Sequence, residues 1–119
     1  MTTKEIADRL VELCRKGQFE QAQKELYAED AASIEPDANS GFPKETYGLE
    51  NIIEKGNLFQ SMIEEVHGST VGEPIIGGNA IAVTLSMDLT MKGRGRSNME
   101  EVCVYEVKDG KIVSEHFFY

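Results

Sequence analysis

The chain has little positive charge and no long apolar run. Lysine and arginine number 12 against 21 acidic residues, which gives the 119 residues a net charge of −9. Nucleic acids and anionic membrane surfaces attract basic faces, so we expect neither as a partner. No stretch approaches the roughly 20 apolar residues that a membrane span needs. The length suits one hydrophobic core, and we expect a single domain over residues 1–119.

The small number of cysteines and histidines excludes two kinds of site. Cys14 and Cys103 form no CxxC pair, so the sequence predicts neither a disulfide framework nor a structural zinc site. Both thiols fall on predicted core faces, and we interpret them as packing residues. The N-terminal stretch MTTKEIADRL is charged and does not resemble a secretory signal. We therefore expect a cytoplasmic protein that uses no metal and no cofactor.

Three helices are predicted from the spacing of apolar residues. The first begins at a capping box formed by Thr2 and Glu5, and it ends at Gly17 because glycine tolerates a left-handed backbone. The second helix is predicted over residues 18–27, and the third over residues 49–66.

An alternating apolar pattern, typical of β-strands, follows the third helix. A shorter strand is predicted between the second and third helices, and residues 36–47 after it are interpreted as a loop that covers a site. The strands are predicted at residues 31–35, 69–76, 81–91, 99–107 and 111–119. Helices followed by antiparallel strands indicate an α+β fold, in which helices pack on one face of a curved sheet.

Three acidic residues on separate predicted strands are candidates for proton transfer. Glu35, directly before Pro36, is either a base in a dry pocket or an exposed acid at a strand end. Glu101 shares a strand face with apolar residues, so it is functional, paired or at the rim. Glu115 and His116 lie on opposite faces of the last predicted strand. Alignment of GKIVSEHFFY with pocket-lining strands of similar proteins favours an inward Glu115 and an outward His116; the opposite register would make His116 an acid–base candidate.

The three carboxylates would repel one another if they converged in a dry interior. At least one of them would then remain protonated, which could supply a proton donor beside a proton acceptor. The alternative is a lysine or arginine that lies among them and balances their charge.

Three stretches of the sequence resemble a known family. They are KGQFEQAQKELYAEDAASIEP, GLENIIEKG and YEVKDGKIVSEHFFY, and their order and spacing are similar to those of the NTF2-like superfamily, in its SnoaL-like branch, over essentially the whole chain. The resemblance implies a cystatin-like cone in which three N-terminal helices pack on a strongly curved, mostly antiparallel sheet. It also implies an apolar small-molecule pocket at the wide end and, in many members, a homodimer through the outer face of the sheet.

The family includes ketosteroid isomerase, polyketide cyclases, epoxide hydrolases and dehydratases, as well as modules without chemistry. The resemblance places Glu35 where isomerase-like members carry the acid that moves the proton, and Glu101 on the strand of a second, protonated acid. Leu10 stands where those members have a hydrogen-bonding tyrosine, so isomerisation of a steroid-like enone is not expected. The expected ligand-binding residues are Phe59, Met62, Met87, Tyr105, Phe117 and Tyr119.

Three hypotheses for the function follow. The first is an enzyme of the isomerase, cyclase or dehydratase type, with Glu35 as base and Glu101 and Glu115 as further catalytic candidates. The second is a module that binds a small apolar ligand without acid–base chemistry. The third is a dimeric association domain with a filled interior.

Overall fold

The computed structural model describes residues 1–36 and 41–119, in which three helices and seven strands form one α+β architecture. In chain order the elements are α1 (Thr3–Arg15), α2 (Phe19–Leu26), β1 (Tyr27–Ile34), β2 (Glu45–Tyr47), α3 (Leu49–Ser61), β3 (Ile63–Val71), β4 (Ile75–Gly77), β5 (Ala80–Met91), β6 (Gly95–Lys108) and β7 (Lys111–Phe118). No helix in this part of the chain has both the length and the apolar character needed to cross a membrane.

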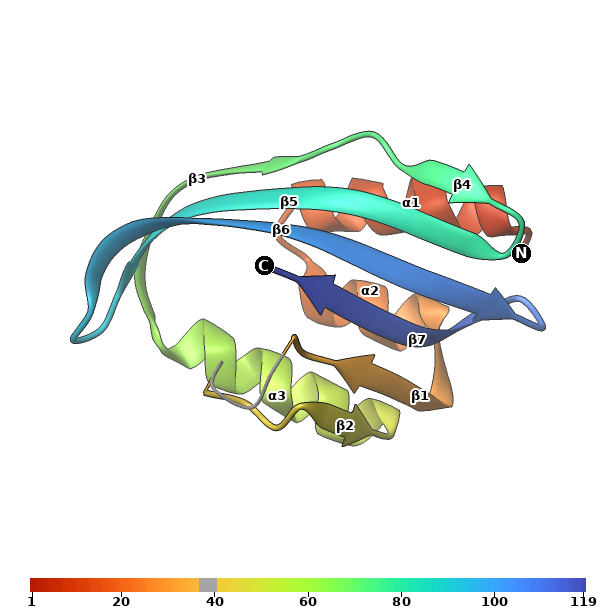
Figure 1. Ribbon diagram of the computed structural model, residues 1–119, viewed down its shortest axis with the longest axis horizontal. Coiled ribbons are helices and arrows are strands. Elements are labelled where there is room, and N and C mark those ends of the chain that lie inside the picture. The colour runs from red at the N-terminus through yellow and green to blue at the C-terminus, as the bar shows by residue number, and fades with distance from the viewer. Residues whose placement is uncertain (37–40) are drawn as a thin grey trace.

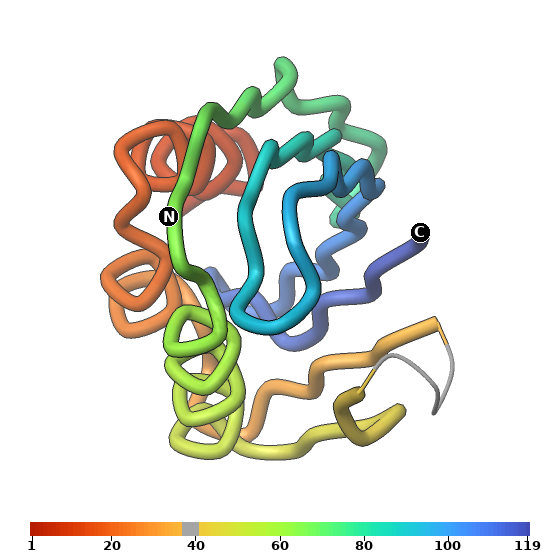
Figure 2. The backbone as a smooth tube through the Cα atoms, turned by 90° about the vertical axis from the view of Figure 1, so that its left-hand side faces the viewer, coloured from red at the N-terminus to blue at the C-terminus, as the bar shows by residue number. Residues whose placement is uncertain are grey.

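The strands form a single curved sheet, and the helices cover one of its faces (Figures 1 and 2). The strand order is β2-β1-β7-β6-β5-β3, and β4 pairs with β5 beside β3. The β1–β7 pair is parallel and the other pairs are antiparallel. The expected α+β fold of three helices on a strongly curved, mostly antiparallel sheet is confirmed.

The ends of α1 follow the predicted signals. The Thr2 hydroxyl accepts from the backbone N–H of Glu5, and the Glu5 carboxylate accepts from the backbone N–H of Thr2. This reciprocal pair satisfies two backbone donors that the first helical turn leaves free. Gly17 lies just beyond the helix with φ +72°, a conformation that favours glycine.

Several predicted boundaries are wrong. The strand predicted at residues 69–76 is divided between β3 and β4, and the strand predicted at residues 31–35 begins at Tyr27. The third helix ends at Ser61 and not at residue 66, because β3 begins at Ile63 and pairs with β5. The Lys92 N–H donates to the Met62 carbonyl at 2.9 Å, so the β5–β6 turn holds the chain where the helix stops. Val66 is therefore exposed on a strand and does not lie on a buried helix face.

The predicted loop over residues 36–47 is also partly wrong. Its last three residues form β2, which pairs with β1 in the register Ile34 with Glu45. Residues 37–40 of the predicted loop lie outside the described residues.

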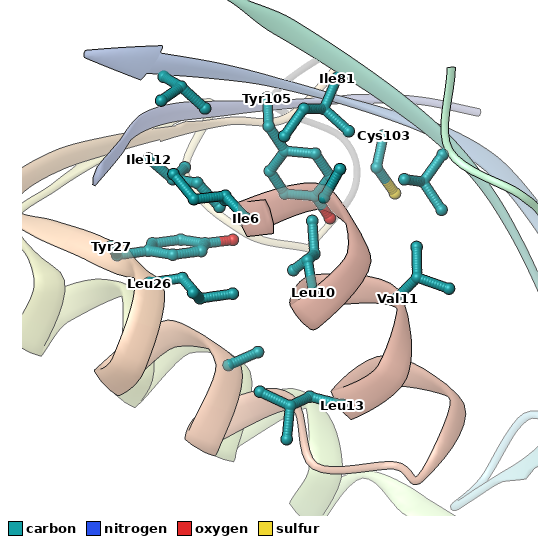
Figure 3. Close-up of a cluster of buried hydrophobic side chains, with 14 of the residues drawn as sticks. Ile6, Leu10, Val11, Leu13, Leu26, Tyr27, Ile81, Cys103, Tyr105 and Ile112 are labelled. Atoms are coloured by element: carbon teal, nitrogen blue, oxygen red, sulfur yellow. The ribbon is translucent and has the colours of Figure 1, made fainter. Parts of the chain in front are cut away.

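The apolar side chains form two buried clusters. The larger one lies between the sheet and helices α1 and α2, and it contains the inward side chains of Tyr27 and Tyr105 (Figure 3). The smaller one contains Met87, Leu89 and Met91 of β5, together with side chains from the end of α3. Leu85 contacts both clusters, so the middle of β5 is the junction between them.

The free cysteines are both associated with the larger cluster. Cys103 is buried, and Cys14 is half-buried against its edge. Burial raises the pKa of the Cys14 thiol to about 12 and moves that of Cys103 further upward. Because only a thiolate is strongly nucleophilic, both thiols pack as apolar groups.

Candidate functional site

Glu115 is a fully enclosed carboxylate at the centre of a polar network. It lies on β7 with an exposed fraction of 3%. Tyr27 donates a hydrogen bond to its Oε1, and the Ser33 hydroxyl donates to its Oε2 at 2.6 Å. Burial raises the pKa of Glu115, while the hydrogen bonds from Ser33 and Tyr27 act in the opposite direction.

The parallel pairing of β1 and β7 positions this network. Ser33 lies directly beside Glu115 in the register of the two strands. Ile112 and Glu115 are both buried although they are three residues apart, whereas a regular strand would point them to opposite faces. Register shifts in the pairing of β7 with both β1 and β6 account for this, because a bulge reverses the alternation. The irregularity turns Glu115 towards the helices.

Lys55 connects Glu115 to a second carboxylate. It projects from α3, and its Nζ donates to Ser33 Oγ at 2.6 Å and to Glu35 Oε1 at 3.0 Å. The side chains of Lys55 and Glu35 are only 11% and 8% exposed, so their ion pair is largely shielded from water. The Lys55 ammonium also lies over the ring of Phe117, 5.4 Å from the ring centroid, at a distance at which a cation is attracted to the ring.

Glu35 is buried rather than exposed at a strand end. Its Oε2 accepts from the Tyr119 hydroxyl at 2.7 Å, while its Oε1 accepts from Lys55. Its backbone N–H donates to the Lys44 carbonyl at 2.8 Å, which fixes the end of β1. Both carboxylate oxygens of Glu35 are thus occupied by protein donors.

Glu101 is the least constrained of the three acids. It lies on the inner side of β6, half-buried, and its Oε1 accepts a weak hydrogen bond from the Cys103 thiol at 3.5 Å. Burial raises the pKa of Glu101 to about 7, with the negative charges of Glu35 and Glu115 adding to the increase and Lys55 opposing it. A carboxyl with this pKa is present in both protonation states near neutral pH, as an acid–base group requires.

The structure therefore brings the three predicted acids together, with a lysine among them. His116 lies apart from them: it pairs with Val104, whose strand neighbours Cys103 and Tyr105 point inward, so His116 is on the outer side of the sheet. Of the two registers considered for β7, the one with an inward Glu115 is the one observed.

The six predicted ligand-binding residues fall into three groups. Phe59 and Met62 pack against the smaller cluster, of which Met87 is a member. Phe117 and Tyr119 contact the network through Lys55 and Glu35. Tyr105 is buried in the larger cluster, where burial raises its pKa well above the usual value.

Sequence reasoning missed Lys55, Ser33 and Tyr27. A signal for Lys55 was present, because it lies three residues after Ile52 and four before Phe59, on the apolar stripe of the third helix. A lysine on a buried stripe needs an acidic partner. Ser33 and Tyr27 carry no comparable signal, since either is ordinary in a half-buried strand.

Leu10 occupies the core with an exposed fraction of 2%, so α1 supplies no hydroxyl at that position.

No group of three or more histidine, cysteine or acidic side chains in residues 1–36 and 41–119 is arranged to hold a metal ion. Donors to Glu35 and Glu115 include the side chains of Lys55, Ser33, Tyr27 and Tyr119.

Three helices on one side of a strongly curved sheet define an α+β domain with the NTF2-like, cystatin-like fold. More narrowly, the chain belongs to the SnoaL-like domain family, whose model matches residues 1–119. No curated protein matches the chain.

Solved structures support the same conclusion. A provisionally named SnoaL-like polyketide cyclase from Mesorhizobium loti is 38% identical, with a TM-score of 0.91 and 100% of both chains covered. Two more distant structures share the fold. A protein with a ketosteroid isomerase-like fold from Catenulispora acidiphila is 18% identical, with a TM-score of 0.74 over 99% of this chain and 87% of that one. IdmH, a provisionally named polyketide cyclase from Streptomyces antibioticus, is 19% identical, with a TM-score of 0.72 over 99% and 91%.

Proposed function

We propose that the protein catalyses proton transfer on a small apolar molecule, with Glu101 as the acid–base group. The observation that carries this proposal is the contrast among three neighbouring acids. Glu35 and Glu115 each accept two hydrogen bonds from protein donors, whereas Glu101 has, within residues 1–36 and 41–119, a single weak thiol partner and a pKa of about 7. A base must have a lone pair directed at the substrate, and Glu101 meets that condition best.

This assignment moves the role of base from Glu35 to Glu101. In the proposed site, Glu35 binds Lys55 directly and Glu115 is linked to it through Ser33, and the negative charges of both acids help to keep the pKa of Glu101 near neutrality. The polyketide cyclase name of the 38% identical relative is in keeping with this reaction type, because ring closure of a polyketide needs proton transfers at carbon.

The proposed binding region lies at the junction of the two apolar clusters. Glu101 pairs directly with Leu85, which contacts both clusters. Phe59, Met62 and Met87 would contact the apolar body of the substrate, and Phe117 and Tyr119 would border its polar end. A carboxyl group between apolar side chains is the arrangement in which a small molecule can be both held and protonated.

Hydrogen–deuterium exchange tests the proposal without knowledge of the natural substrate. Apolar ketones such as 2-tetralone and 2-indanone exchange their activated C–H hydrogens in D2O, and proton NMR measures the rate. We expect the protein to accelerate exchange and Glu101→Gln to abolish most of the acceleration. Glu100→Gln is the matched control, because Glu100 is the exposed neighbour on the other face of β6 and should leave the rate unchanged. No acceleration with any ketone that binds would indicate a ligand-binding module instead.

A second candidate, association into a homodimer, is favoured by the outer face of the sheet. Val102 and Phe118 pair across β6 and β7, and they are 40% and 55% exposed. They border a hollow of about 350 Å³ whose lining includes the polar side chains of Thr70, Thr84 and Ser86. Exposed apolar groups around a hollow are typical of contact surfaces. Sedimentation equilibrium should show a dimer that Phe118→Asp converts to a monomer, and a wild-type monomer at micromolar concentration would exclude this interface.

A further inference from the structure

Lys55 has more hydrogen-bonding capacity than its protein partners use. A protonated lysine has three N–H donors and no acceptor. Within residues 1–36 and 41–119, two oxygens accept from it, Ser33 Oγ and Glu35 Oε1. Beside these lies the ring of Phe117, which attracts the cation but offers no lone pair. One N–H of a nearly buried ammonium can therefore still donate to an oxygen of a bound molecule.

Stability gives a weak reason for a lysine at this place. Removing an ammonium and a carboxylate from water is costly, and a buried ion pair is often no better for the fold than apolar side chains of the same size. Glu35 also has other anchors, since Tyr119 donates to its Oε2 and its backbone is bonded to Lys44. A buried positive charge is better explained by a negative charge that develops beside it.

The proposed base and this spare donor belong to the same site. Glu101 accepts from Cys103 on β6, Cys103 pairs with Phe117 of β7, and the ring of Phe117 lies beneath the Lys55 ammonium. When a base removes a hydrogen from a carbon next to a carbonyl group, the negative charge moves to the carbonyl oxygen. A hydrogen-bond donor already placed at that oxygen stabilises the negatively charged enolate more than the neutral carbonyl compound.

We propose that Lys55 is a further catalytic residue, which donates to the carbonyl oxygen of the substrate and stabilises the enolate formed when Glu101 removes the adjacent proton. The inference rests on the proton-transfer function proposed above. The C–H bond breaks, its proton goes to the Glu101 carboxylate, and its electron pair forms a C=C bond while the carbonyl π pair moves to oxygen. Return of the proton from Glu101 to carbon reverses this flow, so no oxidant or reductant takes part. The substrate class is thus an apolar carbonyl compound with a hydrogen on the adjacent carbon.

A pair of matched probes tests the role of Lys55. 4-Nitrophenolate carries an oxyanion on an apolar ring, as an enolate does, and nitrobenzene is a neutral molecule of similar shape. Binding of both is measured in the Glu101→Gln protein, so that ionisation of Glu101 does not add to the titration of the phenol. Glu35, Glu115 and the Tyr119 hydroxyl, which also face the site, are the same for both probes when the two are compared in one protein.

Two variants remove the ammonium in different ways. Lys55→Met leaves Glu35 without its counter-charge, whereas Lys55→Met with Glu35→Gln removes both charges and keeps the local net charge unchanged. Because the double variant leaves no unpaired charge at Glu35, it should fold even if the single variant does not. The parent protein of these variants is Glu101→Gln with Lys55 intact. In it we expect the phenolate to bind about ten- to a hundredfold more tightly than nitrobenzene, which is the range of one charge-assisted hydrogen bond. In both Lys55 variants this preference should vanish while nitrobenzene binding persists.

Each result has a definite meaning. A phenolate preference that survives in the folded double variant overturns the role of Lys55 and leaves the proposed proton-transfer function in place. Equal binding of the two probes by the parent protein overturns it as well. If neither probe binds to the parent protein, the apolar binding region itself is wrong, and the proposed function fails together with the inference.

Discussion

Replacement of Glu101 by glutamine should change how stability depends on pH. Glutamine has nearly the same shape as a protonated glutamic acid but cannot ionise. In the wild-type protein, Glu101 must ionise in a half-buried, apolar position when the pH rises, and its pKa is raised from 4.5 to about 7 for that reason. Glu101→Gln removes this ionisation and nothing else of comparable size.

The direction in which stability changes with pH follows from proton linkage. A carboxyl with a higher pKa in the folded state binds its proton more tightly when folded, so protonation favours folding. This stabilisation is complete below pH 4.5 and is lost as the pH rises through 7. The full shift corresponds to about 3 kcal/mol, of which about 2 kcal/mol should appear between pH 5 and pH 8 after allowance for the partial exposure of Glu101.

Urea unfolding at several pH values measures the effect. The free energy of unfolding of Glu101→Gln should match that of the wild type near pH 5 and exceed it by about 2 kcal/mol at pH 8. Glu100→Gln, on the exposed face of the same strand, should show no such divergence. Parallel pH profiles for wild type and Glu101→Gln would refute the reasoning, because they would mean that Glu101 is solvated in the folded protein and ordinary in its acidity.

Other substitutions test the rest of the polar network and the packing of the sheet that carries it. Lys55→Met should lower the free energy of unfolding by about 3–5 kcal/mol, because it leaves the buried carboxylate of Glu35 without its positive partner. Adding Glu35→Gln should recover most of that loss, and a loss below about 1 kcal/mol in urea unfolding would contradict a buried ion pair. Tyr27→Phe removes a donor to the buried carboxylate of β7 and should cost about 1–3 kcal/mol in the same assay. Gly72→Ala places a Cβ in steric conflict with Thr84 Oγ1, so thermal unfolding should show a loss of about 1–3 kcal/mol that Thr84→Ala reduces.

The fold could be predicted because its signals are local or periodic. The capping box at Thr2, the glycine after α1 and the alternation along β5 and β6 each depend on a few neighbouring residues. The end of the third helix could not be found in this way, because Ile63 and Val66 continue an acceptable helical pattern. Their strand conformation comes from pairing with β5, a contact that spans more than twenty residues of sequence.

The acids could be predicted, but their differences could not. Alternation placed Glu101 on an inward face, whereas the choice of Glu115 over His116 came from similarity to pocket-lining strands and agrees with the structure. The bulge that turns Glu115 inward after Ile112 leaves no clear mark in the sequence. The partners that distinguish the three acids come from α3, β1 and the end of the chain, so their roles depend on the assembled fold.

The position of the polar network argues for chemistry over structure. It lies where α3, β1 and β7 meet, beside two apolar clusters that could have been joined by apolar side chains alone. A fold that needs only packing gains little from two carboxylates and an ammonium buried side by side. Such a set is costly unless its charges act on something that enters the site. In the described part of the chain, protein donors hold Glu35 and Glu115, while Glu101 has only a weak thiol partner. Such a network separates the groups that fix a charge from the group that moves a proton.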